Sequence, residues 1–276
     1  MKSFFAALTV SHALSTVAAE SPKETIQALN NVLDDAFNKQ DFDFVAKHYH
    51  TGAEILPTDA SEFVTQNLAS FFKEAYESGL QDLHLETLNV VVEEDDLWHE
   101  IGNVTTSEEP EGSLYYVRWV KPDSDWQIAF DCMTVGGGFR SAGTTSHSFQ
   151  DGASSEHVQA TNVTQVVSAL ENLWSTLLQT GDFEGAADMY NPGALLIEPT
   201  GSTEFLTQDK FASFFAEQKF GDAVTRKTAV TLQEDATLVH EIGHMHGAQG
   251  STAYYVRWIK PNASWQIAFD IMSVGE

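Results

Sequence analysis

Apolar residues recur along this chain with two distinct periods. Over residues 25–39 they fall every three to four positions, at Ile26, Leu29, Val32, Leu33, Ala36 and Phe37. That spacing collects them on one side of an α-helix, and residues 163–178 repeat it. Four later segments instead alternate between apolar and polar side chains, with turn residues between them: 223–233, 237–246, 252–260 and 265–273. The alternation predicts four strands joined as antiparallel hairpins.

Shorter elements lie between these segments. The pair Asp182-Phe183 precedes a short predicted helix, and residues 194–198 form a predicted strand that Pro199 ends. Residues 204–219 have helical spacing again. Helices followed by a long, curved antiparallel sheet define an α+β domain.

The chain repeats itself. Residues 115–136 read YYVRWVKPDSDWQIAFDCMTVG and residues 254–275 read YYVRWIKPNASWQIAFDIMSVG, with 16 of the 22 positions identical. Earlier matches, such as HEIG at both 99–102 and 240–243, extend the repeat through each half. We therefore predict two copies of one domain, residues 22–136 and 158–276, with a flexible Gly/Ser/Thr-rich linker over 137–157.

The first 19 residues have the pattern of a secretory signal peptide. Lys2 precedes a short apolar run, and the small residues Val17-Ala-Ala19 suit a cleavage site. We expect a secreted protein, or one in the lumen of the secretory pathway. Three N-x-S/T sequons, at Asn103, Asn162 and Asn262, are candidate glycosylation sites. The last of them lies in a predicted turn, and Asn103 lies inside a predicted strand.

Charge and composition exclude some partners. With 14 basic and 40 acidic residues, the formal net charge is −26. Such a surface repels nucleic acid and anionic lipid, so we expect neither as a partner. No later segment has the ~18 apolar residues of a membrane span, so we expect a soluble chain. Cys132 is the one cysteine, and its counterpart is Ile271, which favours a core position.

Residues 240–244 read HEIGH, the H-E-x-x-H pattern of zinc proteases. That chemistry needs both histidines on one face of a helix. Here the surroundings alternate like a strand, and the first copy has Asn103 in place of His244. We therefore predict no metal and no cofactor. On a strand His240, His244 and His246 share one face, as ordinary pocket or surface side chains.

Each copy carries an Arg and an Asp in its last two strands. Arg118 and Arg257 are counterparts, as are Asp131 and Asp270. If Lys121 pairs with Trp126 across the turn, Arg118 and Asp131 share a face as diagonal neighbours. The pair would bind a carboxylate or set a pKa in a pocket. The alternative is a structural salt bridge or two solvated side chains, and a register change of one residue would part them.

Five segments together resemble the nuclear transport factor 2-like superfamily, especially SnoaL-like cyclases and the association domain of calcium/calmodulin-dependent kinase II. They are GDFE (181–184), LLIEPTG (195–201), FASFF (211–215), VRW (256–258) and WQIAFD (265–270). The resemblance covers about 115 residues of each copy. It implies two cone-shaped domains, each a curved sheet wrapped around about three helices, with a conical pocket for a small, mostly apolar molecule. On this basis we expect seven residues to line the pockets: Trp174, His240, Tyr254, Arg257, Arg118, Asp131 and His99.

The resemblance also suggests catalysis in the second domain. Ketosteroid isomerases carry a general base just before a proline in the matching short strand, the place of Glu198-Pro199, where the first copy has Leu56-Pro57. Trp174 stands where those isomerases keep a tyrosine. The candidate catalytic residues are therefore Glu198 and Asp270, for isomerase-, dehydratase- or cyclase-like proton transfer. The alternative for Glu198 is an exposed residue at a strand end.

Other functions stay open at this point. Some iota-class carbonic anhydrases repeat this fold, but their HHHSS run is replaced by residues 268–273 (AFDIMS) and 129–134 (AFDCMT). Relatives often dimerise through the outer sheet face, so the two copies are expected to form an internal pseudo-dimer, or the chain a homo-oligomer. A non-catalytic oligomerisation module is the third alternative.

Overall fold

The computed structural model describes residues 21–57, 63–135, 161–198, 203–218, 224–233, 236–247 and 250–274. The predicted signal peptide and the predicted linker lie outside these residues. Each half forms helices and a largely antiparallel set of strands, so the predicted α+β class is confirmed. None of the described helices is both long and apolar enough to cross a membrane.

The two halves share one order of elements, except that the second has an additional short strand, β7. The first has helices α1 (Pro22–Asn38), α2 (Phe42–Lys47) and α3 (Leu68–Glu77), with strands β1 (Tyr49–Leu56), β2 (His84–Glu94), β3 (Leu97–Thr105), β4 (Ser113–Val120) and β5 (Gln127–Val135). The second has helices α4 (Thr161–Thr180), α5 (Phe183–Ala187) and α6 (Gln208–Gln218), with strands β6 (Tyr190–Ile197), β7 (Leu206–Thr207), β8 (Thr225–Gln233), β9 (Leu238–Gly247), β10 (Gly250–Ile259) and β11 (Gln266–Val274).

Local capping explains where several helices begin. Ser21 and Glu24 form a capping box at the start of α1, whose first residue is a proline. Asp41 and Asp182 cap α2 and α5, because their side chains accept hydrogen bonds from backbone N–H groups three residues later. The repeated Asp-Phe pair in the sequence is therefore a helix start in both copies.

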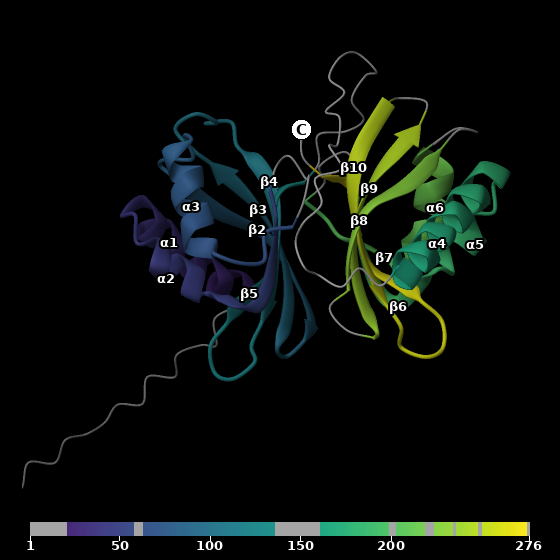
Figure 1. Ribbon diagram of the computed structural model, residues 1–276, viewed down its shortest axis with the longest axis horizontal. Coiled ribbons are helices and arrows are strands. Elements are labelled where there is room, and N and C mark those ends of the chain that lie inside the picture. The colour runs from purple at the N-terminus through teal and green to yellow at the C-terminus, as the bar shows by residue number, and fades with distance from the viewer. Residues whose placement is uncertain are drawn as a thin grey trace, which may run out of the picture.

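The strands follow the order β2-β3-β4-β5 in the first half and β8-β9-β10-β11 in the second. Neighbours in each series are antiparallel, whereas β1 pairs in parallel with β5 and β6 with β11. Register shifts interrupt several of these pairs and bend the sheets. The helices cover the inner face of each sheet, so they lie on the two outer sides of the molecule (Figure 1).

The outer faces of the two sheets pack against each other at the centre of the molecule (Figure 1). Tyr116 stacks on Phe269 with ring centroids 4.2 Å apart, and Phe130 stacks on Tyr255 at 4.3 Å. Tyr116 corresponds to Tyr255, and Phe130 to Phe269, so the same contact occurs twice in reversed roles. That reciprocity is the property of a two-fold interface, here formed within one chain.

The repeated HEIG segment and the repeated YYVRW segment hold neighbouring strands together. Glu100 in β3 accepts hydrogen bonds from the Tyr115 hydroxyl at 2.7 Å and from Trp119 Nε1 at 2.8 Å. Glu241 in β9 accepts the matching bonds from Tyr254 at 2.7 Å and Trp258 at 2.6 Å. The H-E-x-x-H segment is thus a strand, as predicted, and its glutamate binds side chains of the next strand.

The glycine of each HEIG segment is required by the same contact. Gly102 lies directly opposite Tyr115 in the β3–β4 ladder, and Gly243 lies opposite Tyr254 in the β9–β10 ladder. A Cβ atom at either glycine would overlap the tyrosine ring. The tyrosine can lie flat across the strand and reach its glutamate only because the glycine has no side chain.

Candidate functional site in the first domain

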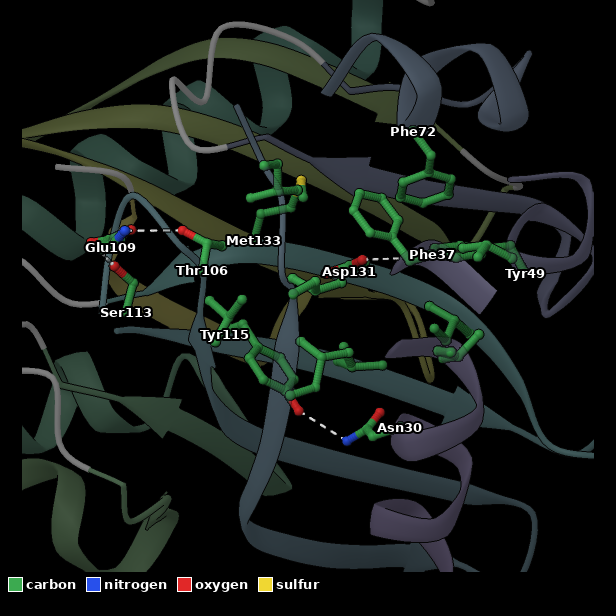
Figure 2. Close-up of a pocket in the computed structure, with 18 residues that line it drawn as sticks. Asn30, Phe37, Tyr49, Phe72, Thr106, Glu109, Ser113, Tyr115, Asp131 and Met133 are labelled. Carbon is green, nitrogen blue, oxygen red and sulfur yellow. Dashed lines mark hydrogen bonds between the residues drawn. The ribbon is translucent and has the colours of Figure 1, made fainter. Parts of the chain in front are cut away.

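A cavity of about 110 Å³ lies between the helices of the first domain and the inner face of its sheet. Its walls are mainly apolar, with Leu33 and Phe37 from α1, Phe72 from α3, and Val117 and Met133 from the sheet (Figure 2). The volume is of the order of the ~150 Å³ of an engineered apolar cavity that binds benzene. An apolar cavity with a few polar groups is the usual form of a small-molecule site.

The first polar group in the wall is the carboxyl of Asp131 in β5. Its Oδ2 accepts a hydrogen bond of 2.6 Å from the Tyr49 hydroxyl (Figure 2). Burial raises the pKa of Asp131 to about 6, and the charge of Glu100 adds to this, while the bond from Tyr49 opposes it. Asp131 is therefore a buried acid that ionises close to neutral pH.

Asn30 of α1 and Tyr115 of β4 form a second polar group. Asn30 Nδ2 lies 2.9 Å from the Tyr115 hydroxyl and 2.7 Å from Glu100 Oε1 (Figure 2). Thr87 donates to the same Glu100 oxygen at 2.8 Å. Burial raises the pKa of Glu100, although its four hydrogen-bond donors oppose the rise. The Glu100 carboxyl accepts hydrogen bonds from all these side chains and does not line the cavity. Of this group, Asn30 and Tyr115 are the residues in the cavity wall.

The cavity reaches the surface beside the β3–β4 turn. Glu109 is exposed there, its N–H donates to Thr106 Oγ1 at 3.0 Å, and its carboxylate accepts from Ser113 at 2.5 Å (Figure 2). Glu109 and Asp131 are the charged residues of the lining, and none of the described lining residues is Lys, Arg or His. The cavity therefore combines apolar walls with negative charge alone.

The same place in the second domain is occupied by an arginine. Arg226 of β8 is buried, and its Nη2 lies 2.9 and 2.8 Å from the two carboxylate oxygens of Asp270. Its guanidinium lies 3.9 Å from the ring centroid of Trp174 and 4.6 Å from that of Tyr254. A second carboxyl, Glu171, lies 3.7 Å from Nη1. Burial and the neighbouring Glu241 carboxyl raise the pKa of Glu171.

Strand register identifies the counterparts in the two domains. Leu85 pairs with Val104, and Arg226 pairs with Met245 at the same position of the matching strands. Leu85 of the first domain is therefore replaced by Arg226 in the second. By the same repeat Leu33 becomes Trp174 and Asn30 becomes Glu171. The acid and its tyrosine are kept, because Tyr190 donates to Asp270 at 2.5 Å as Tyr49 does to Asp131.

The two domains differ at the place where a ligand would bind. We expected the second domain to be the more active one, but the cavity lies in the first, and the interior of the second holds an arginine. Asp270 is bound by Arg226 and Tyr190, and Trp174 and Tyr254 contact the guanidinium. Asp131 does line the cavity.

Glu198 follows the last residue of β6 and is half-buried. Leu56 pairs with Cys132 of β5, and Ile197 pairs with Ile271 of β11. Because Cys132 and Ile271 are counterparts in the repeat, Ile197 is the counterpart of Leu56. Glu198 therefore corresponds to Pro57, and the comparison of Glu198 with Leu56 was off by one position. The repeat offset changes in the loop after these strands, which hid the correct match.

The predicted contact between Arg118 and Asp131 is wrong. The turn pairs Val120 with Gln127 as expected, but a bulge then shifts the register by one. Arg118 lies opposite Phe130, while Asp131 lies opposite Val117, so the two charges are on different faces of the sheet. In the second domain Arg257 and Asp270 are separated in the same way.

Four predicted pocket residues lie instead on the outer face, between the two sheets: Arg118, Arg257, His99 and His240. His99 Nε2 lies 2.6 Å from Glu93, and Arg257 Nη2 lies 3.5 Å from the same carboxylate across the interface. His240 Nδ1 lies 3.0 Å from Glu54 of the other copy. Burial lowers the pKa of His99 to about 4, so this imidazole is neutral at physiological pH.

The remaining predicted positions are the three sequons and two histidines of β9. Asn262 is exposed in the turn between β10 and β11, Asn103 is half-buried in β3, and Asn162 is in the first turn of α4. His244 and His246 lie on β9 with ring centroids 6.4 Å apart. Use of the sequons is not tested by the structure and stays a prediction.

The sequence patterns did not indicate that Tyr49, Asn30, Leu85 and Arg226 belong to these interiors. The exchange of Leu85 for Arg226 was visible in the repeat at an offset of 141 residues. A lone arginine in an alternating strand nevertheless has the pattern of a solvent-facing residue, so burial was not indicated. The cavity itself depends on the distance between helices and sheet, which the pattern does not contain.

No family model and no curated protein matches the sequence. Solved structures that are similar include a putative calcium/calmodulin-dependent protein kinase II association domain from Xanthomonas campestris (20% identity, TM-score 0.34), which aligns over 40% of this chain and 86% of that one. An NTF2-like protein of unknown function from Shewanella oneidensis (12%, 0.34) aligns over 40% and 96%. A domain of unknown function with a cystatin-like fold from Nostoc punctiforme (20%, 0.35) aligns over 55% and 98%. NTF2-like proteins are thus among the structural neighbours.

Proposed function

We propose that the first domain binds a small, mostly apolar molecule in its cavity. The observation that carries this proposal is an apolar cavity with the buried Asp131 carboxyl in its wall. In the second domain the corresponding space is occupied by the side chains of Arg226 and Trp174. If the cavity were only a packing fault, burial of an acid there would lower stability without any compensating role. A buried acid whose pKa is raised and that lines a cavity marks a candidate functional site.

The test compares a filled cavity with an open one. Leu33→Trp introduces the residue that the second domain has at this position, and Val32→Trp places the same residue at an exposed neighbour on α1 as the matched control. Both proteins are examined by native mass spectrometry for a retained ligand and by thermal melting with small cyclic ketones, alcohols and arenes. We expect wild type and Val32→Trp to bind, and Leu33→Trp to fold without binding. Equal behaviour of all three proteins would refute the proposal.

A second candidate function is proton transfer by Asp131 on a bound carbonyl compound. It is favoured by the pKa of about 6 and by the Asp131 Oδ1, which accepts no hydrogen bond from the described residues. The test is exchange of α-protons of small ketones for deuterium. We expect the rate to rise through about pH 6 as Asp131 ionises, and Asp131→Asn to abolish it while binding remains. Unchanged exchange in this variant would exclude Asp131 as the base.

The second domain has a different role in this proposal. It covers the outer sheet face of the binding domain through the stacked pairs Tyr116–Phe269 and Phe130–Tyr255, so one chain carries its own partner. We also propose that the protein is secreted, on the evidence of the N-terminal pattern of residues 1–19. Detection of the mature N-terminus in culture medium tests this point.

A further inference from the structure

The second domain contains a cation where the first contains a cavity. The guanidinium of Arg226 is buried, bound to both oxygens of Asp270, and lies over the faces of Trp174 and Tyr254. A carboxylate on one side and aromatic faces on the others are what a desolvated organic cation requires. The second copy therefore holds a guanidinium at this point of the fold.

The first domain keeps most of these groups and lacks the cation. Asp131 takes the place of Asp270, and Tyr115 that of Tyr254, while Leu85 stands in place of the arginine. Phe37, Phe72 and Tyr49 add aromatic rings to the cavity wall. The tyrosine that donates to the acid is also kept, and it holds the carboxyl of Asp131 in a fixed orientation.

The charges of the cavity agree with this comparison. The described residues of its lining include two acidic side chains and no basic one. The raised pKa of Asp131 reflects a buried acid without a cation beside it. Glu109 at the surface end and the net charge of −26 attract cations and repel anions over the whole approach. An anionic ligand such as a carboxylate or phosphate ester is therefore disfavoured at every step.

We propose that the ligand of the first domain is a small organic cation, an ammonium, amidinium or guanidinium on a compact apolar body, whose charged end lies between Asp131 and the ring of Tyr115. The proposal rests on the proposed binding function and adds the chemical class of the ligand. The apolar body occupies the space that Leu33 leaves open and that Trp174 fills in the second domain. The ligand thus replaces the arginine that this copy lacks.

The experiment uses a pair of probes of equal shape. n-Propylguanidinium reproduces the arginine side chain beyond Cα, and n-propylurea is its neutral isostere. Binding of both to the full-length protein is measured by calorimetry near neutral pH. A charge-assisted hydrogen bond exceeds a neutral one by about 1.4 kcal/mol, so we expect the cation to bind about 10-fold more tightly or better.

Four variants locate the effect. Asp131→Asn should remove the preference for the cation. Leu85→Arg introduces a cation within the chain and should abolish binding of both probes, whereas the uncharged Leu85→Met should keep it. Arg226→Ala calibrates the probe, because n-propylguanidinium should raise its melting temperature more than n-propylurea does by replacing the lost side chain.

The outcomes separate the two proposals. A preference for the cation that depends on Asp131 supports the inference. Equal or tighter binding of n-propylurea overturns it and leaves the binding function intact. The inference is also overturned if n-propylguanidinium rescues Arg226→Ala but does not bind the first domain, while neutral apolar probes do. If no probe of any charge binds the first domain, both proposals fail.

Discussion

Replacing Arg226 by leucine, the residue of the first domain, tests the central comparison of the two copies. The arginine is 1% exposed and donates to both oxygens of Asp270. Its removal leaves that carboxylate in the core with the Tyr190 hydroxyl as its remaining hydrogen-bond donor among the described residues. Glu171 also loses the positive charge that lies 3.7 Å away.

The magnitude follows from the first domain, where the corresponding acid has no cation. The pKa of Asp131 there is about 6, against 3.8 for an ordinary Asp. If Asp270 behaves in the same way, the stranded acid costs roughly 3 kcal/mol at neutral pH. Breaking a buried ion pair by removing one partner costs about 3–5 kcal/mol in general. We therefore expect Arg226→Leu to lower the free energy of unfolding by about 3–5 kcal/mol.

The loss should depend on pH with a defined sign. In the variant the native acid would bind its proton more tightly than the unfolded chain does, so stability falls as the pH rises from about 4 to 6. The damage should therefore be smaller by about 1–2 kcal/mol at pH 5 than near pH 7. Urea unfolding followed by tryptophan fluorescence measures both values, since Trp174 lies against the guanidinium.

The control is the double variant Arg226→Leu/Asp270→Asn. It removes the stranded charge and should recover most of the loss, and the double-mutant cycle gives the coupling of the two residues. A loss below about 1 kcal/mol, or one that is the same at both pH values, would refute the view that Arg226 neutralises Asp270.

Three further predictions follow. Asp131→Asn should raise the free energy of unfolding by about 1–3 kcal/mol near pH 7 and by little below about pH 4. The reason is that the wild-type protein loses stability as the pH rises through the Asp131 pKa of about 6. Urea unfolding at several pH values checks this, and a difference that is constant with pH would contradict it. Phe269→Ala should cost about 3–5 kcal/mol and separate the unfolding of the two domains, because it removes the ring stacked on Tyr116. Calorimetry should then resolve two transitions, and a single transition would show that this ring contact does not couple the unfolding of the two domains. Gly102→Ala should destabilise by about 1–3 kcal/mol and displace Tyr115, whose ring occupies the space of the new Cβ; an unchanged melting temperature would show that the ring is free to move.

Repetition and periodicity in the sequence were enough to predict the architecture. The amphipathic helices, the alternating strands and the two-copy organisation need only local patterns and self-comparison. The expected helix over residues 163–178 corresponds to α4 (Thr161–Thr180), and the four last strands agree with β8 to β11 within about two residues. The strand at HEIGH followed from alternation in the same way.

Details that depend on a single residue of register were not predictable. One bulge between Arg118 and Trp119 placed Arg118 on the opposite face from Asp131, and a loop indel misaligned Glu198 by one position. Because side chains of a strand alternate between faces, an error of one residue reverses every assignment on it. No local pattern in the turn distinguishes the two registers.

The sequence by itself determined that this protein consists of two α+β copies with acidic surfaces, because period, repeat and charge are properties of the chain. The tertiary structure alone decided which copy has room for a ligand. Leu85 and Arg226 each fit an alternating strand equally well, and their difference acquires meaning only where the strand faces Asp131 or Asp270 across a closed interior. In the buried interior of the second domain Arg226 neutralises Asp270, whereas its counterpart Leu85 is part of the apolar wall of the cavity. The difference matters because an unpaired charge is costly only away from water.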